Sequence, residues 1–114
     1  MIPGKYNIVC PQGSTYNQQF TYSIDDVPVN LFGYTARMQV REKHTSTTKI
    51  LDLTTENGRI ALGTSAGTIT INVPASNTAA LVAKDYVYDL ELISSDIVTR
   101  LFEGKFLVTA EVTK

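Results

Sequence analysis

Hydrophobic and polar residues alternate with a period of two along most of this chain. The clearest apolar positions are Tyr34, Ala36, Met38 and Val40 in residues 33–41, and Ile69, Ile71 and Val73 in residues 68–73. Because successive side chains of a β-strand point to opposite faces, this alternation predicts strands with one buried and one solvated face. Such strands are typical of antiparallel sheets.

The same pattern predicts further strands at 6–10, 20–24, 48–55, 59–62, 86–93, 97–102 and 105–112. The apolar faces of two of them are Phe20, Tyr22 and Ile24, and Phe106, Val108, Ala110 and Val112. Turn-forming residues separate the strands at Asp25-Asp26, Asn57-Gly58, Ser65-Ala66-Gly67, Ser94-Ser95-Asp96 and Glu103-Gly104. Asn57-Gly58 favours a type I′ turn, so it predicts a hairpin that joins 50–55 to 59–62. The polar segment 42–49 is predicted to be the loop of another hairpin.

Only residues 74–85 depart from this alternation. They contain Ala79, Ala80, Leu81 and Ala83, with Pro74 at the start and Ser76 or Asn77 available as an N-cap. One to two helical turns near 75–84, crossing between sheets, would suit this segment. About seven to nine short strands with one helical crossover predict an all-β antiparallel sandwich, with a barrel as the alternative.

Composition limits what the chain can be. A chain of 114 residues with 43% hydrophobic content fits a single domain over 1–114 with one core. Ten Lys and Arg against eleven Asp and Glu give a net charge of −1, without the basic run that nucleic-acid binders carry, so no nucleic acid is expected as a partner. Neither a signal peptide nor a membrane span is predicted, and we expect a soluble product made in a reducing cytoplasm.

Few residues offer metal or redox chemistry. Cys10 and His44 are the only cysteine and the only histidine, which excludes an internal disulfide and a Cys/His zinc set. Cys10 ends an apolar run before Pro11, where a buried and inert thiol is expected. Asp25-Asp26 lacks the spacing of a calcium loop and is interpreted as a turn. No metal and no cofactor is therefore predicted.

The strongest candidate for catalysis is the acidic pair Asp89 and Glu91 in YVYDLEL, residues 86–92. On one strand face their carboxylates would lie about 7 Å apart, within the range that inverting glycosidases use. Any strand with acids at i and i+2 produces this spacing. Because Tyr86 or Tyr88, with Leu90 and Leu92, would face the core, we interpret the acids as the outer, partly solvated face of the strand.

No other catalytic arrangement is found in the sequence. His44 lies in a loop rich in Ser and Thr, but a G-x-S-x-G nucleophile elbow is absent. Gly58, Gly63 and Gly67 lack the Gly-Lys-Ser/Thr of a phosphate loop. The tyrosines, at positions 6, 16, 22, 34, 86 and 88, are scattered over separate strands and do not form a stacking platform. We therefore predict no catalytic, cofactor-binding or metal-binding residues and a protein that is not an enzyme.

Four segments together resemble a family of small bacteriophage virion proteins. The segments are PVNLFGYTARMQVRE (28–42), GTITINVPASNTAAL (67–81), YVYDLEL (86–92) and VTRLFEGKFLVTAEVT (98–113). The plan is similar to the immunoglobulin-like N-terminal domain of phage baseplate upper proteins, which 30–37 and 88–92 match. The resemblance implies an immunoglobulin-like β-sandwich in which Tyr86 or Tyr88 is the counterpart of the tyrosine corner.

What the resemblance implies about function is a structural role in the virion, in the tail, baseplate, neck or fibre-attachment region. The expected partners are other virion proteins and copies of the chain itself, without a membrane. The segments STYNQQ (14–19) and VTAEVTK (108–114) are the candidate contact edges. Capsid decoration is one alternative. A carbohydrate- or receptor-binding module is another, for which Phe32 and Tyr16 are the candidate exposed aromatics.

Overall fold

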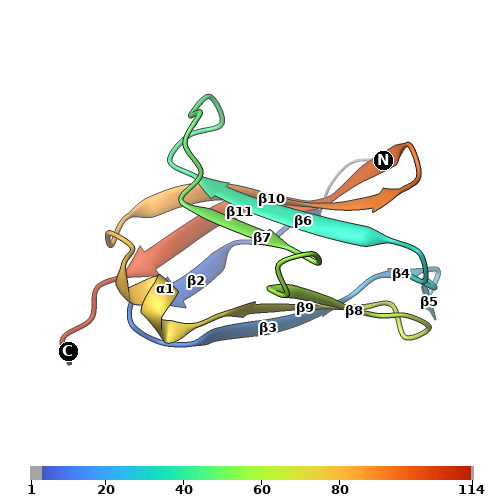
Figure 1. The fold of residues 1–114 in the computed structure, drawn as a ribbon, viewed down its shortest axis with the longest axis horizontal. Helices are drawn as coiled ribbons and strands as arrows, with labels where there is room; N and C mark the ends of the chain where they lie inside the picture. Colours follow the sequence, from blue (N-terminus) through green and yellow to red (C-terminus); the bar gives the residue numbers. More distant parts are fainter. Residues whose placement is uncertain (1–3, 114) are drawn as a thin grey trace.

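The computed structural model describes residues 4–113, which form two facing sheets (Figure 1). The larger, six-stranded sheet has the order β1-β11-β10-β6-β7, and β2 also pairs with β11. Its strands are β1 (Gly4–Lys5), β2 (Ile8–Pro11), β6 (Thr35–Arg41), β7 (Leu51–Thr54), β10 (Asp85–Ser94) and β11 (Ile97–Thr109). Residues 1–3 and Lys114 of the predicted domain lie outside the described residues.

The smaller, three-stranded sheet has the order β3-β9-β8, and a two-stranded ribbon, β4-β5, lies at one end of the molecule (Figure 1). The strands are β3 (Tyr16–Thr21), β8 (Ile60–Gly63), β9 (Thr68–Val73), β4 (Ser23–Ile24) and β5 (Val27–Pro28). Strands β1 and β2 each pair with β11 in parallel, and all other strand pairs are antiparallel. This is an immunoglobulin-like sandwich, with β3, β9 and β8 in one sheet and β11, β10, β6 and β7 in the other, which confirms the predicted fold class.

The strand number differs from the prediction because short pieces add to it and two predicted strands are one. Three of the eleven strands, β1, β4 and β5, have only two residues each. The predicted break at Glu103-Gly104 is wrong, since β11 continues through it. A Cβ at Gly104 would lie 2.4 Å from the Tyr6 carbonyl oxygen. This glycine therefore allows the segment between β1 and β2 to pass close to β11, and it does not form a turn.

The hairpin predicted at Asn57-Gly58 is also wrong. β7 pairs with β6, and β8 pairs with β9 in the other sheet, so residues 55–59 carry the chain between sheets. Gly58 has φ +79° but Asn57 is not among the positive-φ residues, which excludes a type I′ turn. Instead the Asn57 side chain accepts from the Thr54 N–H at 3.0 Å, and the Thr54 hydroxyl oxygen accepts from the Asn57 N–H at 2.9 Å.

Two other predicted turns are confirmed. Asp25 and Asp26 have φ +51° and +64° and form the tip of the β4-β5 hairpin. Residues 42–49 connect the antiparallel strands β6 and β7, as expected for a hairpin loop.

The single helix of the described residues, α1 (Ala75–Ala79), crosses from β9 to β10 as predicted. It is shorter than 75–84, and its N-cap residue is Pro74, without a side-chain cap from Ser76 or Asn77. Thr78 is fully buried, and its hydroxyl donates to the Ser14 carbonyl at 2.7 Å, which ties the crossover to the start of β3. Within residues 4–113, no helix is long and apolar enough to span a membrane.

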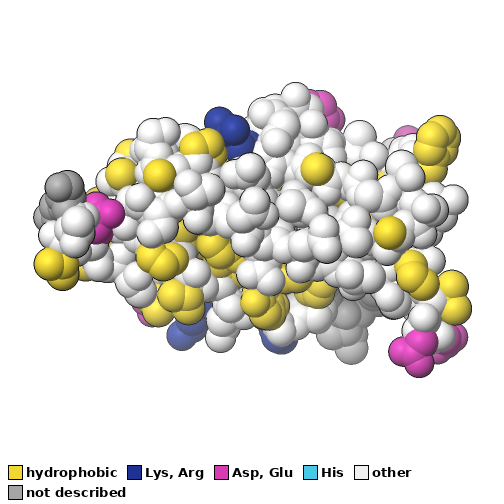
Figure 2. All heavy atoms as spheres, turned by 90° about the horizontal axis from the view of Figure 1, so that it is seen from below, with side chains coloured by type: hydrophobic (Ala, Val, Ile, Leu, Met, Phe, Trp, Pro, Cys, Tyr) yellow, Lys and Arg dark blue, Asp and Glu magenta, His cyan; other side chains and the backbone are white. Residues whose placement is uncertain are grey.

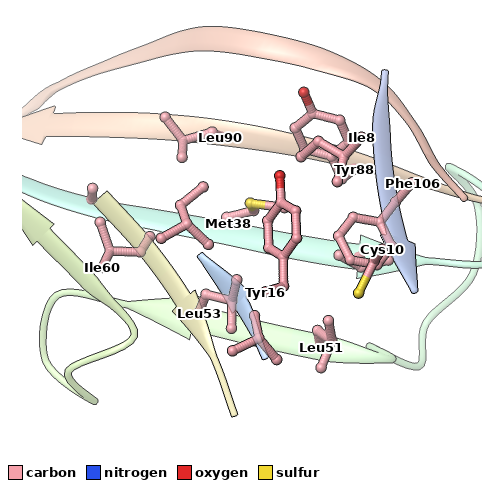
Figure 3. Close-up of a cluster of buried hydrophobic side chains, with 14 of the residues drawn as sticks. Ile8, Cys10, Tyr16, Met38, Leu51, Leu53, Ile60, Tyr88, Leu90 and Phe106 are labelled. Carbon is pink, nitrogen blue, oxygen red and sulfur yellow. The ribbon is translucent and has the colours of Figure 1, made fainter. Parts of the chain in front are cut away.

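The core lies between the sheets and contains most of the predicted apolar faces (Figure 3). The predicted core residues that are buried are Ala36, Met38, Val40, Ile69, Ile71, Val73, Tyr86, Tyr88, Leu90, Leu92, Phe106 and Val108. At the ends of two predicted strands the alternation places residues in the core that are in fact exposed. Ile24 is 56% exposed and Val112 is 95% exposed. Ile24 belongs to the two-residue strand β4, and Val112 lies beyond the end of β11 at Thr109.

Candidate functional site

Asp89 and Glu91 lie on the outer face of β10, in the middle of the six-stranded sheet. Glu91 stands opposite Arg37 on β6 and Arg100 on β11. The Arg37 Nε atom lies 2.8 Å from Glu91 Oε1, and the Arg100 Nε atom lies 3.5 Å from Asp89 Oδ2. Each acid therefore has a basic partner across the sheet, and the pair belongs to a charged ladder, as the interpretation of an outer face predicted.

An open hollow of about 220 Å³ lies over this ladder. Its lining includes Arg41, Asp89, Arg100 and Glu103, together with His44 from the β6-β7 loop. The sequence did not connect His44 with Asp89, because the hairpin loop that brings them together is set by tertiary pairing. The side chains that line the hollow include no serine, threonine or cysteine, so it offers charged groups without a nucleophile of these types.

The proton affinity of Asp89 follows from its place in the ladder. Partial burial raises the pKa of Asp89, and the neighbouring Glu91 and Glu103 raise it further, while Arg100 and His44 act in the opposite direction. The hydrogen bond from Lys5 lowers the pKa of Glu103. The pKa values of the neighbouring carboxyls of Asp89 and Glu103 therefore shift in opposite directions, and burial, neighbouring charges and an ion pair account for both shifts.

The other polar candidates do not come together. Cys10 is fully buried in the core, and burial raises the pKa of its thiol. Asp25-Asp26 lies at an exposed hairpin tip. Within residues 4–113, no group of three or more His, Cys, Asp and Glu side chains could hold a metal ion.

The tyrosines of β10 fix the connections of the sandwich. The Tyr86 hydroxyl donates to the Val82 carbonyl at 2.8 Å, four residues upstream at the start of the strand, which is the geometry of a tyrosine corner. The Tyr88 hydroxyl donates to the Tyr6 carbonyl at 2.6 Å and so holds the link between β1 and β2. Of the two tyrosines that the sequence left open, Tyr86 is therefore the corner.

The three-stranded sheet presents a different outer face. Figure 2 views the molecule from this side: uncharged side chains and backbone cover the middle, and charged side chains lie towards the rim. None of the residues of β3, β8 and β9 is charged. The outward positions of the two longer strands are Asn17, Gln19 and Thr21, and Thr68, Thr70 and Asn72. These outward side chains of β3 and β9 carry hydroxyl and amide groups only, and the exposed residue of β8 is Ala61.

The edge of this sheet at β3 is open. Among the described strands, β3 pairs only with β9. The predicted contact segment 14–19 thus lies largely on a free strand edge. The second predicted segment, 108–114, differs, because Val108 and Thr109 pair with β2 inside the larger sheet.

The β4-β5 ribbon and the β10-β11 hairpin lie at the same end of the molecule (Figure 1), and both carry exposed apolar side chains. Phe32, in the segment between β5 and β6, is 78% exposed, and the Asn30 side chain accepts a hydrogen bond from the Phe32 N–H at 3.0 Å. The exposed apolar residues of the ribbon and the hairpin are Ile24, Val27, Ile97 and Val98. The second candidate aromatic, Tyr16, is only 9% exposed and lies between the sheets (Figure 3), so that expectation is wrong.

Comparison with known protein families and curated proteins gives no match that bears on the function of these surfaces. No family model matches the chain, and no curated protein is significantly similar to it.

Proposed function

We propose that this protein is a non-enzymatic structural subunit of a bacteriophage particle, in the tail, baseplate, neck or fibre-attachment region. It acts by assembling with copies of itself and with other virion proteins. The observation that carries the proposal is the three-stranded sheet, which combines an uncharged outer face with an open edge at β3. The resemblance of 28–42, 67–81, 86–92 and 98–113 to phage virion proteins supports the same role.

The uncharged sheet supports assembly for a physical reason. Sheets that remain in water usually carry charged side chains or prolines on their edges, because a bare edge is a template for another strand. β3 has neither. Covering hydroxyl and amide groups also requires less desolvation than covering charges, and such groups can hydrogen-bond across a contact.

The test is whether the chain is part of the particle. Particles are purified by density gradient from a culture of the organism that encodes the chain, washed in high salt and analysed by quantitative mass spectrometry. We expect a constant number of copies per particle, with an abundant cytoplasmic protein of the same culture as the contamination control. Detection only as a free monomer in the lysate, and never in particles, would overturn the proposal.

A second candidate function, glycan or receptor binding, is favoured by Phe32. An exposed aromatic side chain whose backbone N–H is bonded by the Asn30 amide is the kind of group on which sandwich proteins bind sugars. A glycan array with the wild type and Phe32→Ala tests this function. Binding that is lost in Phe32→Ala but kept in Val82→Ala, a change at another exposed apolar residue, would support it. An array without signal would remove it.

A further inference from the structure

The free edge of β3 has a defined hydrogen-bonding pattern. The Tyr22 N–H donates to the Gly67 carbonyl of the neighbouring chain segment at 2.8 Å. Because backbone groups alternate between the two sides of a strand, the even-numbered residues of β3 bond to β9. The N–H and C=O groups of Asn17, Gln19 and Thr21 therefore point to the open edge, and their side chains are exposed.

These three residues are symmetric about Gln19. An antiparallel copy of β3, related by a two-fold axis at Gln19, would place Asn17 opposite Thr21 of the copy and Gln19 opposite itself. Each such pair exchanges two backbone hydrogen bonds, so the three pairs would form about six. Outward side chains would then meet as amide with hydroxyl and amide with amide, which can hydrogen-bond to each other.

An aromatic cluster lies beside this edge. The rings of Tyr6 and Phe20 are 5.2 Å apart, and those of Phe20 and Phe102 are 5.0 Å apart. The cluster joins β3 to β11 and to the residue after β1, and it is incompletely covered, since Tyr6 is 39% exposed and the two phenylalanines are half-buried. A strand laid along β3 would cover apolar surface here in addition to pairing the backbone.

Charge decides in favour of a copy of the same chain. A two-fold contact places the residue on the axis opposite its own copy, so a charge at that position would meet a like charge. β3 has no charged residue, whereas the edge strand β7 of the larger sheet carries Asp52, with Lys49 close by at 3.3 Å. The other edge of the small sheet, β8, is uncharged but has only four residues.

We propose that two copies of this chain pair through β3, antiparallel and in the register centred on Gln19, to join their three-stranded sheets into one continuous sheet. The role of this pairing in a phage particle rests on the proposed function. The partner is a second copy, and the recognition is backbone pairing by strand addition.

Sedimentation velocity over a range of concentrations tests the pairing. We expect a dimer for the wild type and a dimer Kd raised about tenfold or more in Gln19→Lys, because the two ammonium groups would meet on the axis. Ala61→Lys, which adds the same charge to the exposed edge strand β8, should leave the dimer intact. A wild type that stays monomeric, or an equal loss in Ala61→Lys, would overturn the proposal.

A cross-link tests the register without relying on a weakened variant. Opposite residues of a hydrogen-bonded pair have Cα atoms about 5.5 Å apart, which suits a disulfide. Gln19→Cys should form a covalent dimer under mild oxidation, whereas the two cysteines of Asn17→Cys would have Cα atoms about 14 Å apart and should not. The buried Cys10 is common to both variants. Equal cross-linking of the two variants would exclude this register.

The two proposals fail in different ways. If the chain is absent from particles but Gln19→Cys cross-links and Asn17→Cys does not, the pairing stands and the virion function fails. If the chain is present in particles but the wild type is monomeric, the function stands and the β3 pairing fails.

Discussion

The two sheets of this sandwich share one core but have opposite outer faces. The six-stranded sheet carries acids and bases that pair across β6, β10 and β11, such as Arg37 with Glu91. The three-stranded sheet carries only uncharged side chains on β3, β8 and β9. Both faces satisfy the same alternation of apolar and polar positions, so alternation alone does not separate a face that remains in water from one that is suited to contact.

The difference lies in what each face loses when it is covered. Paired charges on the larger sheet are hydrated, and burying them would require removing that water. Hydroxyl and amide groups on the smaller sheet lose less hydration free energy when they are covered, and they can form new hydrogen bonds across the contact. The charged sheet therefore favours solubility, and the uncharged sheet favours association.

The largest expected effect comes from the core that both sheets share. Leu90 is fully buried between the outward residues Asp89 and Glu91. Leu90→Ala removes packed apolar atoms and should lower the free energy of unfolding by about 2–5 kcal/mol, measured by urea denaturation. If Leu90→Ala cost no more than a change at either neighbouring acid, the assignment of inner and outer faces on β10 would be wrong.

A smaller effect is expected where the larger sheet holds its first strands. Tyr88→Phe removes the hydroxyl that donates to the Tyr6 carbonyl, and should lower the free energy of unfolding by about 1–3 kcal/mol. Tyr34→Phe, at a half-buried tyrosine beside the core, is the control and should change stability by less than about 0.5 kcal/mol. Equal losses in thermal or urea unfolding would show that the bond to Tyr6 is not what Tyr88 contributes.

The charged ladder on the outer face of the larger sheet should contribute little to the free energy of unfolding. Glu91→Gln breaks the contact with Arg37, in which the arginine side chain is 47% exposed, so the loss should be about 0.2–1 kcal/mol. Unfolding in low salt and in about 1 M NaCl separates the charge contribution, which salt should remove. Thr70→Ala on the uncharged sheet should show no such salt dependence, and a matching dependence there would contradict the contrast between the faces.

The smallest effect concerns pH. Because partial burial and nearby acids raise the pKa of Asp89 above that of the unfolded chain, its ionisation lowers stability above the raised folded pKa. This penalty disappears as pH falls from the folded pKa to the unfolded value of about 3.9. Asp89→Asn should thus be slightly more stable than wild type at pH 7, by less than about 1 kcal/mol since the site is partly exposed and screened.

Unfolding of both proteins at several pH values between 7 and 4 measures this difference. The advantage of Asp89→Asn should shrink as pH falls. An advantage that grows towards acid would mean that the Arg100 contact outweighs burial and that the pKa of Asp89 is lowered.

Local pattern was sufficient for most strands and for the roles of several residues. Met38, Leu90 and Ile71 are buried where alternation predicted, and Asp25-Asp26 forms the predicted turn. Alternation succeeds because one face of each strand must be removed from water, whichever strand lies next to it. For the same reason it correctly placed Asp89 and Glu91 on the outer face.

Predictions failed where a distant segment decides the local structure. Gly104 looked like a turn but lies inside β11, since the backbone of Tyr6 passes over it. Asn57-Gly58 looked like a hairpin, but β7 and β8 have better partners in separate sheets. Tyr16 looked exposed in a polar segment, yet it packs against Phe106 with ring centroids 6.3 Å apart.

The two-faced strands, the helical crossover and the absence of charge on β3 follow from the order of the residues alone. The free edge at β3, the position of His44 near Asp89 and the role of Tyr86, not Tyr88, as the corner became visible only in the folded chain. These features depend on which strands pair, and pairing joins residues far apart in the chain. The physical reason is that backbone hydrogen bonds are the same for every residue type and carry no sequence signal of their partner.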